Sequence, residues 1–136
     1  MRSRTLILLA TSATVAIGCS TNDSTGPASG AWGSAEASLT IEGDTSTLQL
    51  LASGGCVGSY AVVEHAIPTG AFDLPATFTQ LIGAYPGKVS YAAEIIGTHR
   101  GQEMSMAVTV PAIPRVIGPF ALIRGVTHTW SNCLYP

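Results

Sequence analysis

Apolar and polar residues alternate with a period of two along most of this chain from Gly30 onward. In the segment 34–42, alanine, leucine and isoleucine alternate with serine, threonine and glutamate. Such alternation predicts strands with one buried and one solvated face, and no later segment shows the 3.6-residue spacing of an amphipathic helix. The runs predicted to form strands are 34–42, 47–52, 56–64, 71–78, 88–98, 103–110, 116–124 and 127–133.

Turn-forming residues separate these runs, for example Glu42-Gly43-Asp44, Ser53-Gly54-Gly55 and Tyr85-Pro86-Gly87. Such sequences favour short connections between neighbouring strands. We therefore predict one all-β domain over residues 31–136, a small antiparallel up-and-down β-barrel of about eight strands. A barrel is favoured over a sandwich because closure leaves no exposed edge strand. A Greek-key strand order stays open, since a succession of hairpins does not exclude it.

The start of the chain resembles the leader of a bacterial lipoprotein. Arg2 and Arg4 give a positive start, residues 6–17 are mostly apolar, and Gly18 is the small residue before Cys19. The apolar stretch is too short for a membrane-spanning helix, which needs roughly 20 residues. The segment ending at Cys19 is similar to a lipobox, the sequence at which such leaders are cut.

This resemblance implies a signal peptide over residues 1–18 and a mature chain that carries acyl chains, palmitate among them, on Cys19. The implied partner is therefore a membrane, reached through that lipid anchor. Ser20 stands where an aspartate would hold such a protein in the inner membrane, so the outer membrane is expected in a two-membrane bacterium. In a bacterium with one membrane, the extracellular face is expected. A plain secreted protein is the alternative, because Ala16 stands where lipoboxes usually have a larger aliphatic residue.

Residues 19–30 are polar and rich in turn-forming residues, which predicts a flexible tether between the anchor and the domain. Without residues 1–18 the chain has four Lys and Arg and eight Asp and Glu, a formal net charge of 4 − 8 = −4. This balance, with no basic cluster, disfavours binding to nucleic acid.

Three cysteines are present, Cys19, Cys56 and Cys133. If Cys19 carries lipid, the other two are an even pair in an oxidising compartment, where disulfides form and persist. We predict a disulfide between Cys56 and Cys133. Two separately buried thiols are the alternative.

Gly30-Ala31-Trp32 at the start of the first strand, together with Arg124 near the end of the seventh, resembles the calycins, the group of lipocalins and avidins. In that group a Trp from a GxW motif closes one end of the barrel and a cation packs over its ring. The resemblance therefore implies barrel-end packing of Arg124 on Trp32, a cation–π contact worth about 0.5–2 kcal/mol. The alternative is a Trp that simply fills a β-sheet core.

The chain is also similar to a family of uncharacterised secreted bacterial proteins. The matching features are Trp32-Gly33, Cys56, the segment 104–108, the segment 118–125 and Cys133-Leu134. This resemblance supports the fold and the disulfide and implies no activity.

No motif indicates catalysis, so we predict a protein that is not an enzyme and has no cofactor. The segment 54–58 fits GxCxG, a cysteine form of the nucleophile elbow, but that motif needs a helix that does not follow here. His65, His99 and His128 have no metal-ligand spacing and are expected at the surface or at strand ends.

The function predicted from sequence is a non-enzymatic binding or structural role in the cell envelope. One version is a carrier of a small apolar ligand, suggested by small residues expected to face inward: Ala35, Ala37, Gly58 and Ala93. A barrel filled by side chains is favoured over that version. The alternative function is docking on an envelope protein through exposed apolar side chains, for which the candidates are Leu51, Val63, Ile96 and Ile123.

Overall fold

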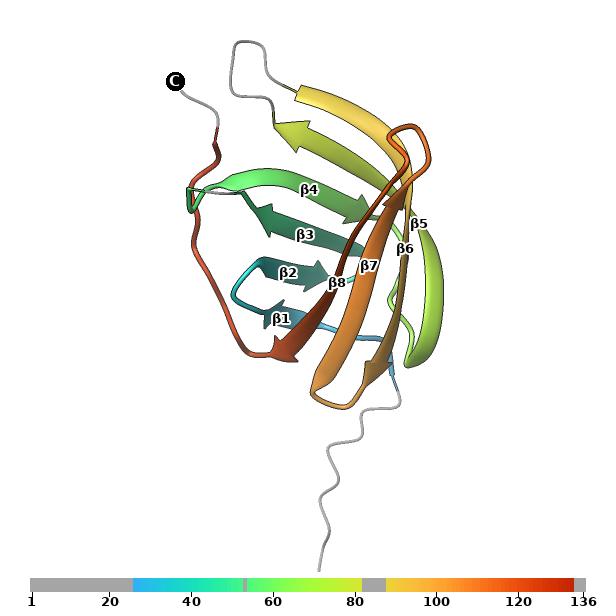
Figure 1. The fold of residues 1–136 in the computed structure, drawn as a ribbon. Coiled ribbons are helices and arrows are strands. Elements are labelled where there is room, and N and C mark those ends of the chain that lie inside the picture. Colours follow the sequence, from blue (N-terminus) through green and yellow to red (C-terminus); the bar gives the residue numbers. More distant parts are fainter. Residues whose placement is uncertain (1–25, 53, 82–87, 134–136) are drawn as a thin grey trace, which may run out of the picture.

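The computed structural model describes residues 26–52, 54–81 and 88–133. They form an all-β domain of eight strands, shown in Figure 1. The strands are β1 (Gly30–Gly33), β2 (Ala37–Glu42), β3 (Thr45–Leu51), β4 (Val57–Val63), β5 (Gly70–Leu81), β6 (Lys88–Arg100), β7 (Glu103–Val110) and β8 (Arg115–Arg124). Within this part of the chain, no helix is long and apolar enough to cross a bilayer.

The strands pair antiparallel in sequence order, and β8 returns to β1 to close a barrel. At the closure, Trp32 lies opposite Arg124 and Gly33 lies opposite Ile123. The predicted up-and-down barrel is thereby confirmed, and a sandwich and a Greek-key order are excluded for these strands. Side chains on the inner face alternate with outer ones as the sequence indicated; in β7, for example, Met104, Met106, Val108 and Val110 are all buried.

Two of the predicted strands were wrong. The first, expected to begin with Gly30-Ala31-Trp32 and to continue through 34–42, is divided by a turn at residues 34–36, where the Ser34 hydroxyl accepts a hydrogen bond from the backbone N–H of Ala37 at 3.2 Å. The turn makes β1 a separate strand, so Arg124 lies on the eighth strand and not the seventh. Residues 127–133 form no strand, although their polar and apolar residues alternate; their one ladder contact is an isolated bridge from Asn132 to Val57.

Because neighbouring strands are antiparallel and follow sequence order, successive turns lie alternately at the two ends of the barrel. One end carries the β1–β2 turn, the β3–β4 turn and the first residues of β6 and β8, and we call it the mouth. The opposite end, called the base, carries the β2–β3 turn, the β4–β5 loop and the β6–β7 turn.

Candidate functional site

The base of the barrel is closed by the chain before β1. The backbone N–H of Ala28 donates to the carbonyl of Ile67 in the β4–β5 loop at 2.9 Å, and the Thr69 hydroxyl donates to the carbonyl of Gly26, also at 2.9 Å. The Ala28 and Ile67 side chains are both buried. These contacts place the two segments across the base, where they keep solvent from the core.

Trp32 fills the inside of the barrel next to this closure. Its side chain is 1% exposed, and its indole Nε1–H donates to the Ser29 carbonyl at 3.0 Å. The Arg124 guanidinium carbon lies 5.9 Å from the centroid of the Trp32 ring. The packing predicted for this pair is present, and the register explains it because the two residues lie opposite each other in β1 and β8.

His99 lies at the end of β6, as expected, but its side chain is not at the surface. It lies on the inner face of β6, is 1% exposed, and meets the Trp32 ring edge-on at 5.2 Å between centroids. His65 is exposed, and His128 is half-buried and stacked on Trp130 at 4.6 Å. Among the described residues, no three His, Cys, Asp or Glu side chains are grouped so as to hold a metal ion.

The mouth, in contrast, contains a cavity of about 580 Å³. It lies between the last residues of β3 and β5, the first residues of β4 and β8, and the β1–β2 turn. The residues that line it are Glu36, Leu50, Leu51, Ala52, Gly58, Ser59, Phe78, Gln80, Arg115, Ile117 and Phe120. The filled barrel that the sequence favoured is therefore present except at the mouth, where the side chains leave this half-open space.

The cavity walls follow from strand register. Ser59 lies opposite Leu50 on β3 and opposite Gln80 on β5, so one short hydroxyl side chain stands between two longer ones on the same wall. Phe78 is buried and Phe120 is half-buried, and they add aromatic surface to the lining. A short residue at Ser59 leaves space that a larger side chain at this position would take.

The four small residues that suggested a pocket lie in different parts of the barrel. Ala37 and Ala93 are buried in the core, and Gly58 lines the cavity. Ala35 was expected to face inward, but it is exposed in the β1–β2 turn, because the turn interrupts the alternation there.

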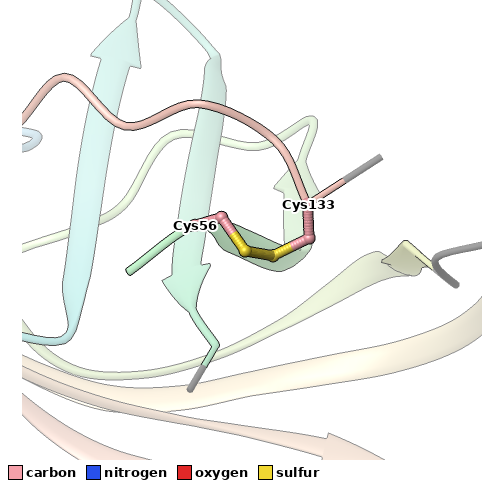
Figure 2. Close-up of a disulfide and its surroundings, with 2 residues drawn as sticks. All are labelled: Cys56 and Cys133. Carbon is pink, nitrogen blue, oxygen red and sulfur yellow. A yellow bond between two sulfur atoms is a disulfide. The ribbon is translucent and has the colours of Figure 1, made fainter. Parts of the chain in front are cut away.

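The predicted disulfide between Cys56 and Cys133 is confirmed; the Cα atoms are 5.0 Å apart and the residues are separated by 77 positions (Figure 2). The chain after β8, residues 125–133, runs past the β1–β2 turn to the β3–β4 turn, and we call it the strap (Figure 1). At its end, Val57 donates its N–H to the Ser131 carbonyl at 2.8 Å and accepts from the N–H of Cys133 at 3.0 Å. Because Cys56 is in a disulfide, the segment 54–58 presents no thiol nucleophile.

The apolar residues proposed for docking do not form one surface. Ile96 on β6 and Ile123 on β8 are exposed, at 46% and 53%. On the outer face of the sheet, the polar residues Thr98 and Ser105 lie between them. Val63 was wrongly placed outside: it is 1% exposed on the inner face of β4. Leu51 is half-buried and lines the mouth cavity.

Cys19 and the predicted signal peptide lie outside the described residues, and so does most of the predicted tether. No family model, curated protein or solved structure matches this chain.

Proposed function

We propose that this protein is a lipid-anchored component of the bacterial cell envelope whose barrel binds a small ligand in its mouth. The observation that carries the proposal is the cavity of about 580 Å³ at one end of a barrel whose other end is closed. Binding pockets for small molecules have volumes of about 300–1,000 Å³ and are lined by apolar side chains with a few polar groups.

The lining is more polar than that of many such pockets. Leu50, Phe78, Ile117 and Phe120 offer aliphatic and aromatic surface, and polar groups come from Glu36, Ser59, Gln80 and Arg115. An eight-stranded barrel has room for one small ligand when some inward side chains are short. Of the two binding roles that the sequence left open, a ligand in the mouth is favoured over docking through outer apolar residues, which are separated.

The anchor supports an orientation for the mouth. Gly26 and Ala28 are held at the base by their hydrogen bonds to the β4–β5 loop, so a tether from Cys19 reaches the barrel at the base. Seven residues from Cys19 to Gly26 span at most about 25 Å when extended. In the proposed arrangement the base faces the anchoring membrane and the mouth opens away from it.

Binding in the mouth can be tested with N-phenyl-1-naphthylamine, a neutral apolar probe whose fluorescence rises in an apolar site. We use the unlipidated chain from residue 20 onward, exported so that the disulfide forms; it contains the whole described barrel. We expect saturable binding, and at least a ten-fold loss of affinity in Ser59→Trp, because the indole would occupy the cavity. Titration of the fluorescence measures both dissociation constants.

The matched control is Ser105→Trp, which adds the same side chain on the exposed outer face of β7. This variant should bind the probe as the unchanged protein does. Equal affinity in Ser59→Trp and Ser105→Trp, with both variants folded by circular dichroism, would place the bound probe elsewhere and contradict the proposal.

The anchor is tested separately by intact mass spectrometry of the protein from its native membrane fraction. We expect a chain that begins at Cys19 and carries acyl chains, and a gain of two hydrogens on reduction of the Cys56–Cys133 disulfide. A chain without acyl chains would remove the anchor and leave a secreted binding barrel.

A further inference from the structure

The charged side chains are distributed unevenly between the two ends of the barrel. Three described ones lie at the mouth, with a formal charge of 2 − 1 = +1: Lys88, Arg115 and Glu36. Six lie at the base, with a formal charge of 2 − 4 = −2: Arg100, Arg124, Glu42, Asp44, Glu64 and Glu103. The mouth is therefore the more positive end of an acidic protein, and such a distribution attracts anions to it.

Arg115 brings part of this charge to the cavity itself. It is the first residue of β8 and lies opposite Val110, whose side chain is buried on the inner face. Two positions further, Ile117 also lines the cavity. An arginine at the rim of a cavity lined by both apolar and polar groups can donate two parallel hydrogen bonds to a carboxylate, sulfonate or phosphate.

Glu36 is the acidic member of the lining, and like Arg115 it is exposed. It lies in the β1–β2 turn, where its backbone carbonyl accepts a hydrogen bond from the N–H of Leu51 at 2.9 Å. Lys88 lies at the same end of the barrel, so the mouth has two positive side chains and one negative side chain, that of Glu36.

We infer that the ligand is an amphipathic anion, with an apolar body between Phe78, Phe120 and Ile117 and an anionic group at Arg115. This inference rests on the proposed function, because it assigns a ligand class to the same cavity. Arg115 is then the residue that distinguishes an anionic ligand from a neutral one of similar shape.

Two probes with the same ring skeleton distinguish binding in the cavity from a preference for an anionic ligand. N-phenyl-1-naphthylamine is neutral, and 1-anilinonaphthalene-8-sulfonate adds one sulfonate. We expect the sulfonate probe to bind more tightly at low salt and to lose that advantage as salt rises. In Arg115→Gln, the dissociation constant of the sulfonate probe divided by that of the neutral probe should rise about five-fold.

Arg100→Gln is the matched control, since Arg100 is an exposed arginine at the base. It should leave the ratio unchanged. If the neutral probe binds but the ratio is the same in Arg115→Gln and Arg100→Gln, the anion inference is wrong and the binding cavity stands. If neither probe binds the unchanged protein, the proposed function itself fails.

Discussion

Removing the disulfide by the double substitution Cys56→Ser and Cys133→Ser is expected to lower the free energy of unfolding by about 4 to 5 kcal/mol. The bridge joins residues 77 positions apart, and closing so long a loop restricts the unfolded chain strongly. A small domain has a total stability of about 5–15 kcal/mol, so the loss is a large fraction of it. Urea denaturation of both proteins measures the difference.

Reduction of the unchanged protein provides the control, because it opens the same bridge and adds only one hydrogen to each sulfur atom. The reduced protein and the double variant should have similar denaturation midpoints. A loss of less than about 1 kcal/mol in both would mean that the strap's hydrogen bonds to Val57 hold the segment without the bridge.

Trp32→Ala is the second large effect, with an expected loss of about 3 to 5 kcal/mol. The indole is buried against His99 and under Arg124, and its removal leaves a cavity at the point where β1 and β8 close the barrel. Thermal or urea unfolding checks the value.

Trp130→Ala serves as the comparison for this substitution. Trp130 is half-buried in the strap and stacks on His128, so the same change in side chain should destabilise the protein less. Equal losses in Trp32→Ala and Trp130→Ala would show that Trp32 has no special part in closing the base.

The barrel was predictable because it depends on local information. Alternation in segments such as 103–110 identifies the strand and its inner face together, and glycine and proline between runs identify the turns. The disulfide followed from the number of cysteines and from the compartment that was expected for the chain. The strap was not predictable from the sequence. Polar and apolar residues alternate in the segment 127–133 as they do in a strand, but this segment pairs with β4 only at Val57.

The candidate site could not be predicted to the same extent. Ser59 and Gln80 carry no sequence signal, since their importance depends on lying side by side across the β4–β5 pair. The place of Arg115 in the cavity lining depends on β8, far away in sequence, beginning at the mouth. His99 was misjudged because its neighbours do not reveal that Trp32, far away in sequence, packs on its ring.

The central claim is that the mouth is the binding site, and mapping the site by nuclear magnetic resonance tests it most directly. Backbone amide signals of the isotope-labelled protein are followed while N-phenyl-1-naphthylamine is added. We predict the largest shifts at Leu50, Ser59, Gln80 and Ile117, and small ones around Ile67 at the base. Shifts gathered instead around Ile96 and Ile123 on the outer face would contradict the account.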